Sequence, residues 1–173
     1  MLNKIAYLVI ILIILTACDS KNNAERENQN ASSAKALEKA NKYLIRTEYE
    51  DIENYMRRHD LKMEETGTGL RYLIYKKGDG IKAEKGKIAV LDYTLSLITG
   101  DVIYSSATDG QKVFKIGQGS VESGLEEAIH FMHVGDEAKL ILPAHLGYGL
   151  LGDNNKIPPR SILMYDIELI EIK

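Results

Sequence analysis

The 173-residue chain has one cysteine, no tryptophan, two phenylalanines and three prolines. A single cysteine excludes an internal disulfide framework and a zinc site made of several thiolates. The 22 Lys and Arg residues and the 25 Asp and Glu residues are interspersed and give a net charge of -3, so no nucleic-acid partner is predicted. Because ten residues are tyrosine, any aromatic pocket has to be built mainly from tyrosine.

Several motifs of catalysis and cofactor binding are also absent. No G-x-S-x-G motif of an α/β-hydrolase occurs. Gly117-Gln118-Gly119 lacks the third glycine of a dinucleotide fingerprint, and Gly80 to Lys87 has the wrong spacing for a P-loop. No third ligand accompanies His130 and His133, so we interpret them as partly exposed helix residues. We therefore predict no metal and no cofactor, and any activity has to depend on shape and hydrogen bonding.

The N-terminal region has the features of an export signal. Lys4 precedes an apolar run of eleven residues, Ile5 to Leu15. A membrane-spanning helix needs about 20 such residues and a signal-peptide core about 7–15, so we predict a signal peptide over residues 1–17. The segment Leu15-Thr16-Ala17-Cys18 resembles the lipobox of bacterial lipoproteins and implies lipidation of Cys18; the alternative is a signal peptide with an incidental cysteine. The lipid would hold the protein to a membrane of the bacterial cell envelope, at the periplasmic face or the cell surface.

Two segments are expected between the signal peptide and the C-terminal domain. Residues 18–34 are predicted to be a flexible tether, because Asp19 to Ala34 contains no aromatic or β-branched residue. Residues 35–68 form a helical segment, with apolar residues at spacings of three and four from Lys35 to Arg58. The stripe lacks sustained heptads, so we favour a helix that packs on its own domain over one that forms a homodimer. Its apolar positions are Leu37, Ala40, Leu44, Ile45, Tyr49, Ile52, Tyr55 and Met56.

Residues 69–173 consist of short strands and turns. A single helical stretch, Gly124 to His133, lies among them. Many strands with one short helix indicate an α+β domain in which an antiparallel sheet carries a helix on one face. The strands are predicted over residues 70–75, 88–98, 102–105, 113–116, 138–142 and 162–172.

Six sequence blocks follow one another in this domain: Val90 to Thr94, Phe114 to Gly117, Val121 to Ala128, Met132 to Leu140, Leu146 to Gly149 and Ile157 to Leu169. Each block alone is weakly specific, but together they resemble the FKBP family of peptidyl-prolyl cis-trans isomerases. The resemblance implies a twisted antiparallel β-sheet wrapped on a short helix, here preceded by a longer N-terminal helix. The signal and helix are also similar to the gliding-motility-associated branch of FKBP lipoproteins.

The resemblance implies a proline pocket with residues at matching positions. Tyr148 falls where a tyrosine hydroxyl bonds the ligand, and the Glu122 N–H falls where the family uses a main-chain donor. Three positions depart from the family: Leu125 replaces a common Trp floor, Ile103 a wall Phe, and Tyr104 an Asp. The smaller floor predicts a deeper or differently filled pocket. The expected catalytic residues are Tyr148, Tyr93 and Phe114, and the expected substrate-binding residues are Ile103, Tyr104, Val121, Glu122, Leu125, Ile157 and Tyr165.

An apolar pocket is sufficient for the implied reaction. Rotation about an X–Pro bond meets a barrier of about 18–20 kcal/mol from amide resonance, and the twisted amide is less dipolar than the planar one. We therefore predict an isomerase that acts on proline-containing polypeptides and assists the folding of exported proteins. The alternatives are a catalytically weak proline-binding module or chaperone, and a structural component of a secretion or motility assembly.

Overall fold

The computed structural model describes residues 32–173. The predicted signal peptide, Cys18 and most of the predicted tether lie outside the described residues. The chain divides into two compact units, of which the second runs from Glu48 to Lys173. No helix within residues 32–173 is both long and apolar enough to cross a membrane.

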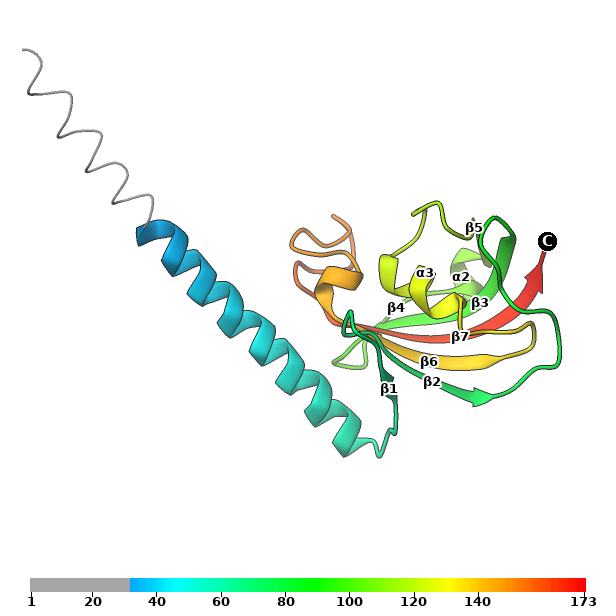
Figure 1. The fold of residues 1–173 in the computed structure, drawn as a ribbon, viewed down its shortest axis with the longest axis horizontal. Helices are drawn as coiled ribbons and strands as arrows, with labels where there is room; N and C mark the ends of the chain where they lie inside the picture. The colour runs from blue at the N-terminus through cyan, green and yellow to red at the C-terminus, as the bar shows by residue number, and fades with distance from the viewer. Residues whose placement is uncertain (1–31) are drawn as a thin grey trace, which may run out of the picture. The chain divides into compact units, whose positions relative to one another are not determined.

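The second unit is built on one antiparallel β-sheet, which confirms the predicted α+β class (Figure 1). The strand order is β1-β2-β6-β7-β3-β4, and β5 pairs with β3. The two ten-residue strands β3 and β7 are paired over most of their length and form the centre of the sheet. The strands are β1 (Glu64–Glu65), β2 (Arg71–Lys76), β3 (Ile88–Leu97), β4 (Val102–Ser105), β5 (Lys112–Lys115), β6 (Glu137–Leu142) and β7 (Leu163–Ile172).

The helix α3 (Ser123–Ile129) covers one face of the sheet, which we call the inner face (Figure 1). Its Leu125 and Ile129 are completely buried in the main hydrophobic cluster. A Cβ at Gly124 would lie 2.6 Å from Leu142 Cγ, so glycine at this position allows α3 to approach β6 closely. This packing places the start of α3 beside the strands that carry the candidate site.

Strand β7 shows how the two faces of the sheet differ. Leu163, Tyr165 and Ile167 are buried on the inner face, whereas the intervening Met164 and Asp166 are only partly buried on the outer face. This alternation follows from the period of two along a β-strand. Neighbouring residues of β7 therefore serve opposite sides of the molecule.

Residues 48–58 end the N-terminal helix and pack on the outer face. Ile52 is 2% exposed and forms a small hydrophobic cluster with Ile141 and Ile162. The buried Arg71 guanidinium lies 3.0 Å from Glu53 Oε1 and 2.8 Å from Glu65 Oε1. This part of the helix therefore packs on its own domain, as the sequence analysis favoured.

Residues 32–47, the described part of the first unit, are helical throughout. The helix includes residues 32–34, which the sequence analysis assigned to the tether. Lys42 and Glu38 form an i,i+4 ion pair of 2.8 Å. Leu37 and Ile45 are exposed in this unit, and a homodimer formed through the helix stays a prediction.

The sequence analysis missed three short elements: β1, α2 (Ser106–Asp109) and the 3-10 helix η1 (Ala144–Leu146). The predicted helix to His133 was too long, because α3 ends at Ile129 and His133 forms an isolated bridge with Lys82. The Asp136 carboxylate accepts the His133 N–H at 2.8 Å and stabilises a turn in place of another helical turn. His130 caps the end of α3.

Candidate active site

A groove of about 470 Å³ opens on the inner side of the domain, where β5, the segment before α3 and the segment after η1 meet. Four residues expected at the site line it, namely Phe114, Val121, Glu122 and Tyr148. The remaining lining residues are Lys112, Val113, Gly119, Ser120 and Gly147.

The strands supply the aromatic interior next to this groove. Tyr93 on β3 and Tyr165 on β7 have ring centroids 6.1 Å apart. Tyr165 is 2% exposed and Phe114 on β5 is 5% exposed, so both are mostly core residues. The expected apolar and aromatic residues all belong to one hydrophobic cluster: Tyr93, Ile103, Tyr104, Phe114, Val121, Leu125, Tyr148, Ile157 and Tyr165.

Leu125 differs from the expected pocket floor. Its side chain is completely buried in the core and is not among the residues that line the groove. Glu122 immediately precedes α3 and occupies its N-cap position. The segment that leads into α3 therefore presents Val121 and Glu122 to the groove, while α3 itself serves the core.

The loop after η1 holds Tyr148 at the groove. A Cβ at Gly147 would lie 2.7 Å from Leu163 Cδ1, so a larger residue there would force the Leu163 side chain on β7 to shift. Gly149 has a φ of 63°, a left-handed conformation that favours glycine. Its N–H donates to the Ala144 carbonyl at 2.8 Å, and its carbonyl accepts the Arg160 N–H at 2.9 Å. The two glycines around Tyr148 therefore serve different purposes: Gly147 allows a close approach to Leu163, and Gly149 allows a left-handed backbone conformation.

Tyr104 on β4 and Ile157 are not among the residues that line the groove, and both are hydrogen-bonded to Asp153. The Tyr104 hydroxyl donates to Asp153 Oδ2 at 2.5 Å and accepts the Asn155 side-chain N–H at 3.1 Å. The Ile157 N–H donates to Asp153 Oδ1 at 2.7 Å, and its side chain is 3% exposed. The Tyr104 hydroxyl, which the family's Asp would not supply, thus holds the loop that contains Asp153 and Asn155 and is not a donor to the groove.

Lys112 is a groove residue that the sequence analysis missed. Its Nζ lies 3.2 Å from Glu122 Oε2 and 3.0 Å from the Tyr165 hydroxyl oxygen. It also lies 5.2 Å from the ring centroid of Tyr93 and 5.4 Å from that of Tyr165, within cation–π range. The period of two in β5 places Lys112 on the same face as Phe114, but a lysine at the start of a strand is usually exposed, so this signal alone does not assign it to the groove.

The Glu122 carboxylate collects the donors of this network. The Tyr165 hydroxyl donates to Glu122 Oε1 at 2.8 Å, and the Tyr148 hydroxyl lies near the same carboxylate. Burial opposes ionisation of Glu122, but Lys112 and the two hydroxyls outweigh it and hold the pKa of Glu122 below its ordinary value. Burial and Glu122 raise the pKa of Tyr148 and of Tyr165. At neutral pH the network therefore holds an ionised carboxylate and two protonated hydroxyls.

A second and larger hollow, of about 650 Å³, lies on the outer face of the sheet. Residues of β2, β3, β6 and β7, of the end of the N-terminal helix and of the segment after it line this hollow. The expected site residues Tyr93 and Tyr165 are among them and are not among the residues that line the groove. No group of three or more His, Cys, Asp or Glu side chains in residues 32–173 is arranged to hold a metal ion.

Comparisons with known proteins identify the family of this chain. The profile of the family described as FKBP-type peptidyl-prolyl cis-trans isomerase matches residues 79–170. FK506-binding protein 2 of Dictyostelium discoideum is 42% identical over 93 residues, which cover 53% of this chain and 70% of that protein. The probable FKBP-type peptidyl-prolyl cis-trans isomerase FkpA of Neisseria meningitidis is 33% identical over 142 residues, which cover 80% of this chain and 51% of that protein.

A solved structure gives the same result for the fold. The crystal structure of FkpA from Escherichia coli matches with a TM-score of 0.63 at 25% identity, covering 86% of this chain and 71% of that chain. The present chain spans about half the length of its Neisseria relative. The chain belongs to the FKBP-type peptidyl-prolyl cis-trans isomerase family, as its sequence blocks implied, and it is an isomerase of that class.

Proposed function

We propose that this isomerase binds its proline-containing clients in the groove between β5, α3 and the Tyr148 loop. The observation that carries the proposal is the convergence of Phe114, Val121 and Tyr148 on one open hollow, beside the partly buried ring of Tyr93 and the buried ring of Tyr165. Ligand sites are typically concave, mostly apolar and supplied with a few polar groups.

The groove favours the twisted form of the X–Pro bond for a physical reason. Planar cis and trans amides are dipolar and lose solvation in an apolar site, whereas the twisted amide has lost its resonance. Binding that is stronger in the twisted state lowers the barrier, and each tenfold in rate needs about 1.4 kcal/mol of this difference. Glu122 and Tyr148 both line the groove, and in this proposal the Glu122 backbone N–H and the Tyr148 ring orient the client.

A groove-filling variant tests the site. In Val121→Trp, the indole occupies the groove and should lower kcat/KM about tenfold or more, measured by NMR exchange on a short blocked proline peptide. Val102→Trp is the matched control, because Val102 is 63% exposed on β4 and does not line the groove. Unchanged turnover in a folded Val121→Trp protein would remove the site from this groove.

We further propose that the protein works as a lipoprotein of the bacterial cell envelope and assists the folding of exported proteins. The apolar run before Cys18 and the similarity to bacterial FkpA proteins support this proposal. Cys18→Ser should abolish labelling by a radioactive fatty acid and release the protein from the membrane fraction. The native chain, with Cys18, should be labelled and stay in the membrane fraction. Retained labelling in Cys18→Ser would contradict the anchor.

A further inference from the structure

The groove contains a charged pair that a purely apolar proline pocket does not need. Lys112 and Glu122 face each other there, with side-chain exposures of 19% and 4%. A buried pair of this kind adds little net stability compared with apolar residues of similar size. Its presence among the residues that line the groove suggests a role in binding.

The Tyr165 hydroxyl of the network has no proton left for a client. A tyrosine hydroxyl carries one proton. The Tyr165 hydroxyl donates that proton to Glu122 Oε1 at 2.8 Å. While Glu122 is ionised, Tyr165 therefore cannot also donate to a carbonyl in the groove.

The ammonium of Lys112 has one donor more than the network uses. An ammonium carries three N–H groups. Within residues 32–173 its Nζ lies 3.3 and 3.2 Å from the two oxygens of the Glu122 carboxylate and 3.0 Å from the Tyr165 oxygen. Because the two carboxylate oxygens are almost equally distant, one N–H directed between them serves both, and a second N–H serves Tyr165. The third N–H belongs to a side chain that lines the groove and is partly open to solvent.

We propose that Lys112 is a client-binding residue of this isomerase, and that its ammonium donates a hydrogen bond to a backbone carbonyl of the proline segment. Glu122 acts as its positioning residue, since it holds the ammonium between the rings of Tyr93 and Tyr165. The inference rests on the proposed assignment of the groove as the client site.

The charges around the groove favour a neutral carbonyl over a carboxylate as the acceptor. Glu122 already neutralises Lys112 inside the groove. At the rim, the negative charges of Asp109 and Asp153 act on Tyr93 and Tyr148, and Lys156 lies over the Tyr104 ring. A client with an acidic residue directly before its proline would add a further negative charge and should bind less well.

A donor to a carbonyl outside the twisting bond has a specific kinetic signature. It holds the planar and twisted states of the client about equally, so its loss raises KM and leaves kcat nearly unchanged. A hydrogen bond to a charged group corresponds to about a tenfold to hundredfold change in affinity.

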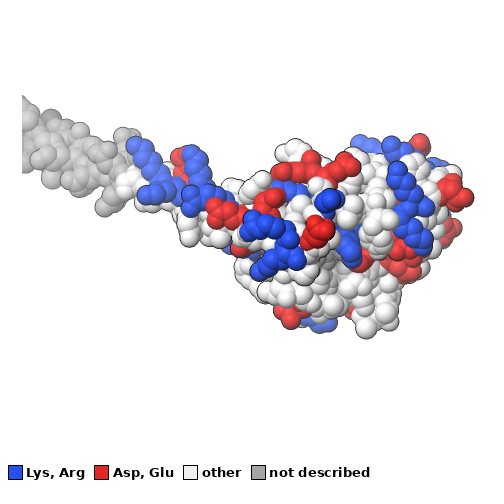
Figure 2. Space-filling view, turned by 90° about the horizontal axis from the view of Figure 1, so that it is seen from below, with Lys and Arg blue, Asp and Glu red and all other residues white. Residues whose placement is uncertain are grey.

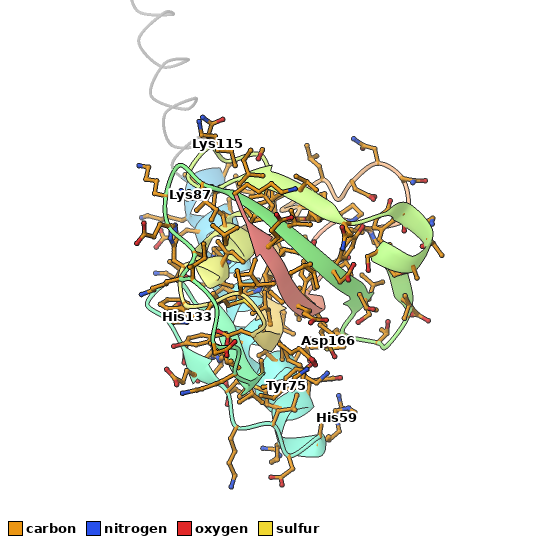
Figure 3. All side chains as sticks on the ribbon, turned by 90° about the vertical axis from the view of Figure 1, so that its right-hand side faces the viewer. His59, Tyr75, Lys87, Lys115, His133 and Asp166 are labelled. Atoms are coloured by element: carbon orange, nitrogen blue, oxygen red, sulfur yellow. The ribbon has the colours of Figure 1, made fainter. Side chains whose placement is uncertain are left out.

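The experiment compares the double variant Lys112→Met/Glu122→Gln with the native protein. Both charges are removed together because either single substitution would leave an unpaired charge in the groove. On a blocked peptide with Leu before Pro, KM should rise about tenfold or more while kcat stays within about twofold. Lys115→Met is the control on the same strand: Lys115 is exposed and lies at the end of the domain away from Tyr75 (Figure 3). It should leave both constants unchanged.

A second measurement keeps the inference testable if the double variant does not fold. In the native protein with 15N-labelled lysine side chains, saturating peptide should shift the Lys112 Nζ signal but not that of Lys115. An unchanged Lys112 signal in a peptide-bound protein would overturn the inference, as would an unchanged KM in the folded double variant.

Two further comparisons separate this inference from its premise. If Val121→Trp abolishes turnover while the Lys112 variant keeps its KM, the groove is the site and Lys112 is not a contact. A peptide with Gln before Pro should bind more tightly than the same peptide with Glu. Tighter binding of the Glu peptide would overturn the inference that the acceptor of the Lys112 hydrogen bond is a neutral carbonyl.

Discussion

Two groups of lysine, carboxylate and tyrosine lie on opposite faces of β7. On the inner face, the buried triad consists of Lys112, Glu122 and Tyr165. On the outer face, the exposed triad consists of Lys139, Asp166 and Tyr75, and Figure 3 shows Tyr75 and Asp166 close together. The lysine lies 5.4 Å from the tyrosine ring centroid in the buried triad and 5.3 Å in the exposed one. The hydroxyl donates to the carboxylate at 2.8 and 2.6 Å.

The two triads differ mainly in their exposure to water. Lys139 and Asp166 are 42% and 41% exposed, and Figure 2 shows basic and acidic atoms interleaved on the side of the molecule that it views. Water can replace any partner removed from the exposed triad, but not readily in the buried triad. The same three groups therefore contribute a surface ion pair at one site and an obligatory network at the other.

The largest effect is expected from breaking the buried triad at its carboxylate. Glu122→Ala leaves the Lys112 ammonium and the Tyr165 hydroxyl without their common acceptor. The free energy of unfolding should fall by about 3–5 kcal/mol, measured by urea denaturation at pH 7. A loss below about 1 kcal/mol would mean that water reaches this triad as freely as a surface pair.

Acid should weaken the buried triad in a defined direction. The pKa of Glu122 is below its ordinary value, so the pair contributes stability above the ordinary carboxyl range and loses it as the pH falls through the lowered pKa. The difference in unfolding free energy between the native protein and Glu122→Gln should therefore shrink on acidification from neutral pH. A difference that grows on acidification would contradict the lowered pKa.

The next largest loss of stability is expected where the end of the N-terminal helix covers the outer face of the sheet. Ile52→Ala removes the apolar contact of the helix end with Ile141 and Ile162 and should cost about 2–3 kcal/mol in urea denaturation. Ile45→Ala is the matched control, because Ile45 is 62% exposed, and it should change stability by less than about 0.5 kcal/mol. Equal losses in the two variants would contradict the different burial of the two side chains.

A smaller effect is expected from the exposed triad. Lys139→Met should lower the free energy of unfolding by at most about 1 kcal/mol, because both charged side chains are already hydrated. Salt at about 1 M should remove most of this difference through screening. A salt-resistant loss similar to that of Glu122→Ala would show that the two triads are equivalent after all.

The smallest effect is expected from pH on catalysis. The groove lowers the pKa of Glu122 and raises those of Tyr148 and Tyr165, so these groups keep their protonation states near neutrality. We expect kcat/KM to change by less than about twofold between about pH 6 and pH 9. A bell-shaped profile centred near neutrality would indicate a general acid or base in the groove.

The sequence predicted the strands well because their apolar residues alternate. The expected strand over 102–105 coincides with β4, and those over 88–98 and 162–172 differ from β3 and β7 by one residue at an end. The short elements were missed because two to four residues are too few to show a period. A polar stretch such as Glu64–Glu65, which pairs with β2, shows no alternation of apolar and polar residues.

The candidate site was predicted unevenly. Phe114, Val121 and Tyr148 could be placed through the resemblance, because each belongs to a block with characteristic neighbours. Lys112 could not, because a lysine at the start of a strand is usually exposed. Its burial depends on Glu122, ten residues away, and on Tyr165, 53 residues away. Contacts of this kind arise from the tertiary fold, and hydrophobic periodicity does not reveal them.

The guanidinium of Arg71 has a consequence for how this enzyme can be recombined with other proteins. Its two carboxylate partners, Glu53 and Glu65, both precede the six family blocks in the chain. A gene fusion that contained the chain only from Gly69 onward would leave the buried Arg71 guanidinium without either carboxylate partner. It would also expose Ile141, which Ile52 covers in the native chain. A domain that is transferred to another protein therefore has to start near Glu48, so that the end of the helix is transferred together with the sheet.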